Sequence, residues 1–173
     1  DRLVGSKVRE RMGGNLRLCI SGGAPLAPQV IEFFFAIGIP ILEGYGLTET
    51  SPVITLNPPG GERPGSVGRA FPGVEMRIAA DGEILTRGPH VMKGYWRNPE
   101  ATSESIRDGW LYTGDIGSVD AEGYLSITGR KKEIIITSGG KNLSPEKIEN
   151  ALKTSPYIKE AVAIGNARHF IAA

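Results

Sequence analysis

Residues 16–50 read LRLCISGGAPLAPQVIEFFFAIGIPILEGYGLTET, and this stretch decides the fold class. The apolar run Leu16–Ile20 predicts a short strand. Pro28–Ile37 predicts a helix, because proline suits a first helical turn and Gly38 follows the end. Pro40–Glu43 predicts a second strand, and two strands joined by a helix form a βαβ unit. Open α/β sheets bind ligands at the carboxyl ends of their strands, so the turn SGGAPL and the loop GYGLTET are expected to face one crevice of an α/β protein.

The loop GYGLTET combines a bendable backbone with an aromatic ring, hydroxyls and a carboxylate. Gly44 and Gly46 lack a Cβ, so the main chain can approach a ligand closely and adopt positive φ. The ring of Tyr45 can stack on a flat base. Thr48 can donate to a phosphate oxygen, and Glu49 supplies the hard oxygen that Mg²⁺ prefers. The set suits a nucleotide phosphate with a metal ion; the alternative is a glycine-rich turn of no chemical consequence.

Further motifs follow downstream in a fixed order. They are Gly82-Glu83-Ile84-Leu85, the run Gly88–Tyr95, the run Gly109–Asp115, and Gly129-Arg130-Lys131-Lys132-Glu133. Together with SGGAPL and GYGLTET they make the chain resemble the adenylate-forming superfamily, which includes acyl-CoA synthetases, beetle luciferases, aryl-CoA ligases and the adenylation domains of nonribosomal peptide synthetases. The resemblance covers essentially the whole chain, and several motifs in order are far more specific than any one.

Two charged residues have physical readings of their own. Asp115 follows a Thr-Gly pair predicted to turn, where a carboxylate could accept from both hydroxyls of a ribose, as an acidic residue does in dinucleotide folds; the alternative is an aspartate that stabilises its turn. Arg130 carries a permanently charged fork suited to ribose or phosphate oxygens. Its alternative is a solvated charge in a run with Lys131, Lys132 and Glu133.

The resemblance implies a role for each matching residue. ATP or AMP contacts are assigned to Gly23, Ala24, Pro25, Glu43, Gly44, Tyr45, Gly46, Thr48, Asp115 and Arg130. Thr48, Glu49 and Arg130 are expected to act in catalysis, with Glu49 as the Mg²⁺ ligand. Lys132 matches the hinge about which a small domain swings, and a hinge belongs at the end of an element. Gly139 and Gly140 match a loop near the channel for CoA.

The same resemblance implies two domains. Residues 1–129 would close a large domain, with the βαβ unit over about 1–56 and a distorted β-barrel over about 57–129, and residues 130–173 would begin a small α+β domain. In the barrel region, Val74–Ile78 and Glu83–Arg87 alternate around Asp81-Gly82, which predicts a hairpin. Trp96, Trp110, Phe71 and Tyr95 are expected to pack rather than to bind ligands. In the small domain, Ser144 is expected to cap a helix and Ile158–Ile164 to form a strand.

Composition excludes several function classes. Lys plus Arg is 20 and Asp plus Glu is 19, so the net charge of +1 provides no electrostatic footprint for nucleic acid. No segment reads as a signal peptide or as a transmembrane span, since the most apolar run, Val30–Gly38, is far short of the ~20 residues that a spanning helix needs. A cytoplasmic protein is expected, and a peripheral membrane contact through a lipid substrate is compatible with it.

The implied activity has two steps. A carboxylic acid reacts with ATP to give an acyl-adenylate and pyrophosphate, and CoA then takes the acyl group to give acyl-CoA and AMP. The run from Gly129 to Pro145 resembles long-chain fatty acyl-CoA synthetases most, although Ile136 stands where other relatives carry a lysine. A module that loads a carrier protein and a noncatalytic nucleotide-binding homologue are the alternatives. The family's phosphate loop is expected before Asp1 and its catalytic lysine after Ala173, so this chain alone is not expected to complete the reaction.

Overall fold

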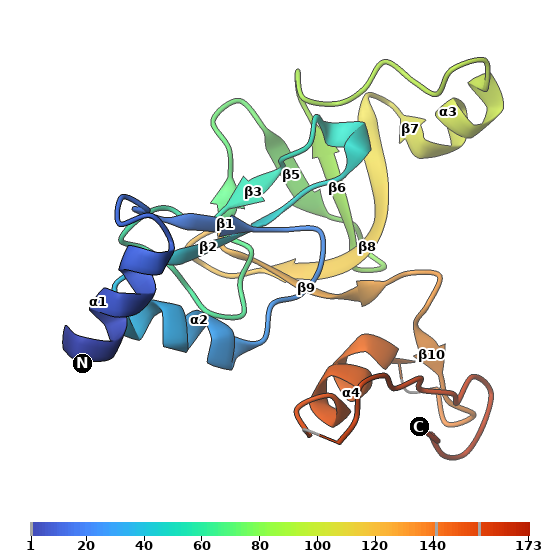
Figure 1. Ribbon diagram of the computed structural model, residues 1–173. Coiled ribbons are helices and arrows are strands. Elements are labelled where there is room, and N and C mark those ends of the chain that lie inside the picture. Colours follow the sequence, from blue (N-terminus) through green and yellow to red (C-terminus); the bar gives the residue numbers. More distant parts are fainter. Residues whose placement is uncertain (1, 141, 156) are drawn as a thin grey trace.

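The computed structural model describes residues 2–140, 142–155 and 157–173 (Figure 1). Asp1, and Lys141 of the run used for the resemblance, lie outside the described residues. The first sheet has the order β1 (Cys19–Ser21), β2 (Ile41–Tyr45), β3 (Thr55–Leu56) and β4 (Arg69–Ala70). Strands β1 and β2 are parallel, and the later pairs are antiparallel. The predicted α/β class and the βαβ unit are confirmed.

Helix α2 (Pro28–Ala36) is the crossover of that unit and has the predicted ends. Pro28 occupies its first turn, Ile37 is the C-cap, and Gly38 follows with φ +79°. Helix α1 (Arg2–Arg11) was not predicted, because its sequence RLVGSKVRER has no continuous apolar stripe. It is tied to α2 by the Arg9 guanidinium, which donates to the carbonyl oxygen of Ile37.

The second sheet has the order β5 (Glu75–Ile78), β6 (Glu83–Arg87), β8 (Trp110–Val119) and β7 (Ile106–Arg107), with β9 (Leu125–Arg130) also paired to β8. The β5–β6 hairpin turns at Asp81-Gly82 as predicted. The expected barrel is not closed within the described residues, because β5 pairs only with β6 and leaves the sheet open. The long strand β8 bends between these neighbours (Figure 1). The short elements η1 (Thr48–Thr50) and α3 (Pro99–Ser105) lie in the β2–β3 and β6–β7 connections.

A small apolar core joins the two sheets. Tyr45, Ile54, Ile84 and Leu125 pack together with exposed fractions of 8% or less. Backbone hydrogen bonds reinforce the junction, since Leu125 donates to Gly68 and accepts from Val67. Strand β9 is therefore held by both sheets.

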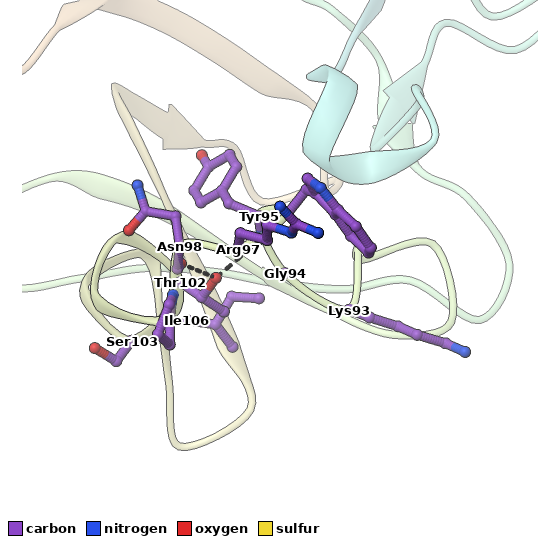
Figure 2. A pocket seen from close by; sticks show the side chains of 10 residues that line it. Lys93, Gly94, Tyr95, Arg97, Asn98, Thr102, Ser103 and Ile106 are labelled. Atoms are coloured by element: carbon purple, nitrogen blue, oxygen red, sulfur yellow. Dashed lines mark hydrogen bonds between the residues drawn. The ribbon is translucent and has the colours of Figure 1, made fainter.

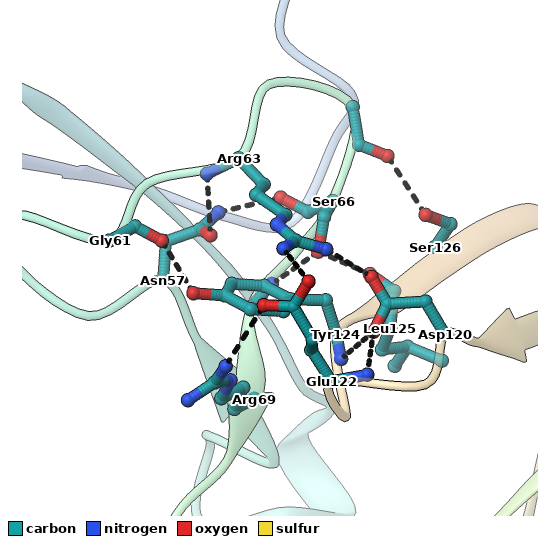
Figure 3. A network of polar contacts seen from close by, with 12 residues as sticks. Asn57, Gly61, Arg63, Ser66, Arg69, Asp120, Glu122, Tyr124, Leu125 and Ser126 are labelled. Atoms are coloured by element: carbon teal, nitrogen blue, oxygen red, sulfur yellow. Dashed lines mark hydrogen bonds and ion pairs between the residues drawn. The ribbon is translucent and has the colours of Figure 1, made fainter.

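A polar network fixes the loop between β3 and β4 to the β8–β9 hairpin (Figure 3). The guanidinium groups of Arg63 and Arg69 each lie 4.3 Å from the centre of the Tyr124 ring. Arg63 pairs with Asp120 and Glu122, and the Tyr124 hydroxyl donates to a carbonyl of the loop at 2.7 Å. The two cation–π contacts hold the Tyr124 ring, and the charge pairs hold Arg63 in place. We call Arg63, Arg69, Asp120, Glu122 and Tyr124 together the Tyr124 brace.

The four aromatic residues expected to pack do not behave alike. Trp110 does pack, between the guanidinium groups of Arg77 and Arg87 at 4.1 and 4.7 Å. Trp96 is 86% exposed, Phe71 42% and Tyr95 38%, so these three are not part of a core among the described residues, and their packing at an interface stays a prediction.

The C-terminal region contains β10 (Ile135–Ile136), β11 (Asn142–Leu143) and α4 (Pro145–Leu152). Ser144 stands at the N-cap of α4 as predicted, but its hydroxyl makes no capping bond and is buried without a partner among the described residues. The predicted strand Ile158–Ile164 is absent from the described residues; only Ile164 forms a bridge, to Ala172. Val162 is 67% exposed, because no neighbouring strand covers this segment.

His90 is held in its neutral form beside β6. Thr86 donates its hydroxyl to the Glu75 carbonyl, so at 2.9 Å it accepts from Nε2 of His90. Nδ1 is buried without a partner among the described residues. Protonation would place a charged, unpaired N–H there, and burial accordingly lowers the pKa of His90.

This geometry predicts a pH dependence of stability. Above about pH 6.5 both folded and unfolded chains hold a neutral imidazole, whereas at lower pH the unfolded chain binds a proton that the folded chain disfavours. Stability should therefore fall with acidification, and His90→Gln should lose less between about pH 7 and pH 5 than the wild type. Thermal unfolding of the full-length protein, with His169→Gln as the matched control, measures this. An equal fall in melting temperature for His90→Gln and the wild type between about pH 7 and pH 5 would contradict the prediction.

Candidate functional site

The SGGAPL turn and the GYGLTET loop lie side by side at the carboxyl ends of β1 and β2. Ser21 is in register with Glu43, and a β carbon on Gly22 would lie 3.2 Å from the Gly44 carbonyl oxygen. Gly23, Ala24 and Pro25 are exposed in the same turn. The predicted proximity of the two loops is confirmed.

The glycines beside Tyr45 serve packing rather than an unusual backbone angle. Neither Gly44 nor Gly46 has positive φ, which corrects that expectation. A β carbon on Gly46 would lie 1.7 Å from the Pro52 carbonyl oxygen, and one on Gly44 would lie 2.9 Å from the Leu56 side chain. The loop can therefore fold back on residues 52–56 only if both positions lack a side chain.

Tyr45, Asp115 and Arg130 form one polar group, in which Tyr45 and Asp115 are buried and the Arg130 side chain is 61% exposed. The Tyr45 hydroxyl donates to Oδ2 of Asp115 at 2.7 Å, and Nε of Arg130 lies 3.3 Å from Oδ1. Asp115 and Arg130 are direct partners across β8 and β9. Burial, then the Asp115 charge, raises the pKa of Tyr45, so its phenol stays a donor. Because Tyr45 is only 8% exposed, little of its ring is free to meet a base.

Asp115 lies inside a strand and not after a turn. The Thr113-Gly114 pair belongs to β8, where Gly114 has φ +75°. The Thr113 hydroxyl accepts from the Asp115 N–H at 3.1 Å and donates to the Ile84 carbonyl at 2.8 Å. Asp115 is thus fixed by sheet pairing and is not needed to stabilise a turn, which removes that alternative.

A second polar cluster, not foreseen from the sequence, anchors the segment before Lys132. Glu83 is 4% exposed and accepts from the Gly114 N–H at 2.9 Å and from Nζ of Lys131 at 2.8 Å. Lys131 also reaches Asp81 at 2.6 Å, and its N–H donates to the Gly114 carbonyl. Hydrogen bonds to Asp81 and Glu83 raise the pKa of Lys131. The sequence showed only a charged run, in which Lys131 read as solvated.

Lys132 is exposed in the turn between β9 and β10, and its role as a hinge stays a prediction. Gly139 and Gly140 are exposed in the turn that follows β10, where the Gly140 N–H donates to the Thr137 carbonyl at 2.8 Å. These three residues lie outside the Tyr45–Asp115–Arg130 group.

Thr48 and Glu49 lie in η1, with Thr48 exposed and Glu49 half-buried. Oε1 of Glu49 accepts from the Tyr95 hydroxyl at 2.8 Å. The neighbouring Thr50, which was not singled out from the sequence, is fully buried and accepts from the Leu47 N–H at 2.9 Å. Its side chain shapes the loop that presents the other two.

Glu43 is half-buried in the middle of β2, and burial raises the pKa of its carboxyl group. Its carbonyl oxygen accepts from the Asn57 N–H at 2.9 Å, which ties β2 to the loop after β3.

Neither a protein-only metal cage nor a spanning helix is found where the chain is described. Across residues 2–140, 142–155 and 157–173, no three His, Cys, Asp or Glu side chains gather around a point that could hold a metal ion. In the same ranges no helix is long and apolar enough to cross a bilayer.

Comparisons with known proteins agree with these motifs. The chain is 50% identical over 173 residues to the long-chain-fatty-acid–CoA ligase FadD15 of Mycobacterium tuberculosis, covering 100% of this chain and 29% of that protein. It is 41% identical over 163 residues to an indoleacetate–CoA ligase of Aromatoleum aromaticum, covering 87% of this chain and 32% of the relative. The chain thus spans about a third or less of the curated relatives.

A solved structure and two family models extend the agreement to the fold. The O-succinylbenzoate CoA synthetase of Bacillus subtilis, in complex with ATP and magnesium, superposes with a TM-score of 0.81 at 34% identity, covering 90% of this chain and 35% of that one. The family model of an AMP-binding enzyme C-terminal domain matches residues 132–173. The model of the AMP-binding enzyme itself matches residues 2–96, more than half of the chain, and the chain therefore belongs to the AMP-binding enzyme family.

Proposed function

We propose that the full-length protein containing this chain is an AMP-forming acid–CoA ligase of the cytoplasm. It would activate a long-chain fatty acid with ATP and transfer the acyl group to CoA. The observation that carries the proposal is the Tyr45–Asp115–Arg130 group, with its buried carboxylate and exposed guanidinium. A carboxylate has about four acceptor sites. Tyr45 and Arg130 occupy two, so two remain for the hydroxyls of a ribose.

The proposed adenylation step uses residues of both loops. The acid's carboxylate attacks the α-phosphorus of ATP, and the bond to the β-phosphate oxygen breaks to release pyrophosphate. Asp115 and Arg130 hold the ribose, while the backbone of Gly23–Pro25 and that of Glu43–Gly46 line the base edge. The exposed hydroxyl of Thr48 donates to phosphate. The protein contributes mainly position and charge complementarity.

Glu49 fits the requirements of Mg²⁺ in this scheme. Mg²⁺ bound to a nucleotide usually keeps several waters and takes only one or two protein carboxylates. Glu49 offers one partly exposed carboxylate, of which Tyr95 engages Oε1. The ion would supply positive charge to offset the phosphates.

For the second step we propose a rotation at Lys132, close to the predicted boundary between domains 1–129 and 130–173, so that the residues after Lys132 move. The C-terminal family match begins at residue 132, directly after Lys131, which the contact with Glu83 anchors to the large domain. After rotation, the Gly139-Gly140 turn lies by the incoming thiol. The sulfur of CoA attacks the acyl carbonyl, AMP leaves, and the thiol proton passes to solvent.

One measurement tests substrate class and acceptor together. ATP–pyrophosphate exchange on the full-length protein, with fatty, aryl and amino acids, is expected to be fastest with long-chain fatty acids. Faster exchange with an aryl acid would indicate an aryl acid as the substrate, like the acid in the name of the indoleacetate–CoA ligase relative. Acyl transfer to free CoA separates a ligase from a module that loads a carrier protein, and no exchange with any acid would indicate a noncatalytic homologue.

Glu49→Gln is expected to lower adenylation and to raise its Mg²⁺ requirement, because the change keeps the shape of the side chain and removes its charge. The loss of one charged contact should cost about 1.5–3 kcal/mol, or at least about tenfold in the Mg²⁺ midpoint. Adenosine affinity should stay near that of the wild type. A normal Mg²⁺ dependence would place Glu49 away from the ion.

A further inference from the structure

The segment that follows β6 reaches back to Glu49 through two contacts. The Met92 N–H donates to the Glu49 carbonyl oxygen at 2.8 Å, and the Tyr95 hydroxyl donates to Oε1 of Glu49 at 2.8 Å. Tyr95 and Glu49 are 46 residues apart in sequence. Both the backbone and the carboxylate of Glu49 are thus held by one segment.

Tyr95 is itself fixed by the start of α3 (Figure 2). Its N–H donates to the Thr102 hydroxyl at 2.9 Å, and that hydroxyl donates to the Asn98 carbonyl at 2.8 Å. The Asn98 side chain caps α3 by accepting from Ala101 at 3.0 Å. A β carbon on Gly94 would lie 2.7 Å from Thr102, so the chain passes too close for any other residue. The phenol therefore projects from a constrained backbone.

The chemistry of the donor suits a carboxylate that must keep its charge. A lysine or arginine at this place would neutralise Glu49, whereas a phenol donates a hydrogen bond and leaves the negative charge in place.

We propose that Tyr95 is a positioning residue, which holds Oε1 of Glu49 so that Oε2 is presented to the Mg²⁺ of bound ATP. The inference rests on the proposed function, since it requires Glu49 to face that ion. Tyr95 would act through Glu49 and would not touch the nucleotide.

The test measures binding without turnover. Calorimetric titration of the full-length protein with ATP, at several Mg²⁺ concentrations and without an acid substrate, gives the Mg²⁺ midpoint of ATP affinity. Tyr95→Phe keeps the ring and is expected to raise this midpoint by about three- to tenfold, the range for one lost hydrogen bond. AMP affinity without Mg²⁺ should not change. Tyr112→Phe, which removes a hydroxyl from β8, is the matched control and should leave the midpoint unchanged.

A double-mutant cycle keeps the inference falsifiable. If Tyr95 acts through Glu49, adding Tyr95→Phe to Glu49→Gln should change the midpoint little further, whereas independent effects would add. An unchanged midpoint in Tyr95→Phe, or additive effects, would overturn the inference while a shift in Glu49→Gln leaves the proposed function standing. If the wild type shows no Mg²⁺-dependent ATP binding, the proposed function fails first, and the role of Tyr95 fails with it. If Tyr95→Phe does not fold, Thr102→Val serves as the second variant, because it removes the acceptor of the Tyr95 N–H. Thr102→Val is also expected to raise the Mg²⁺ midpoint, and an unchanged midpoint would count against the inference.

Discussion

Asp115→Ala in the full-length protein is expected to weaken ATP binding by up to about a hundredfold. Two ribose hydroxyls would lose their shared acceptor in a partly closed site, and such unmatched donors cost about 1–3 kcal/mol. The change also leaves the buried Tyr45 hydroxyl without its acceptor, so the melting temperature should fall as well. Isothermal titration with ATP, after circular dichroism has shown the fold intact, measures the first effect.

Tyr45→Phe is the matched control for Asp115→Ala. It removes the same buried hydrogen bond and keeps both the ring and the carboxylate. Stability should therefore fall by about 1 kcal/mol while ATP affinity stays close to the wild-type value. An unchanged ATP dissociation constant in folded Asp115→Ala would refute the ribose assignment.

Lys132→Pro is expected to retain much of adenylation and to lose most of thioester formation. Proline fixes φ near −65° and also restricts the preceding residue, so position 132 could no longer adopt two backbone conformations. The structure places this position just after Lys131, which is held by Glu83, and before β10. The loss should fall on the CoA step, because the proposed rotation at Lys132 is needed for that step and follows adenylation.

Pyrophosphate release and acyl-CoA formation, measured separately, decide the hinge assignment. Lys132→Ala removes the charge and keeps the backbone free, so it should preserve both steps. If Lys132→Pro folds but loses pyrophosphate release and acyl-CoA formation equally, Lys132 is a solvated charge and not the hinge. Retention of the CoA step would place the pivot elsewhere.

Local signals in the sequence predicted the elements that local forces decide. Pro28 and Gly38 marked the ends of α2, and Asp81-Gly82 marked the β5–β6 turn. The segment Ile158–Ile164 has strand-forming residues, but among the described residues its only pairing is the bridge from Ile164 to Ala172, so strand propensity alone did not produce a strand.

The candidate site was predictable residue by residue but not as a set of contacts. Motif order pointed to Asp115, Arg130 and Glu49, whereas the bonds that hold them cross long separations. Glu83 and Lys131 are 48 residues apart, and Glu49 and Tyr95 are 46 apart. The local sequence around one partner does not predict the other partner, because sheet register and loop packing bring the two together.

The Tyr124 brace has a mechanical consequence for the proposed cycle. Rotation of the small domain would exert a force on the C-terminal end of β9, where Arg130 pairs with Asp115 of β8. The opposite end of β9 is clamped by Arg63 and Arg69 on the Tyr124 ring and by the charges of Asp120 and Glu122. We therefore expect β9 to pass this force into the loop of residues 57–68, so that Arg130 and Asp115 keep their alignment on the ribose from one turnover to the next.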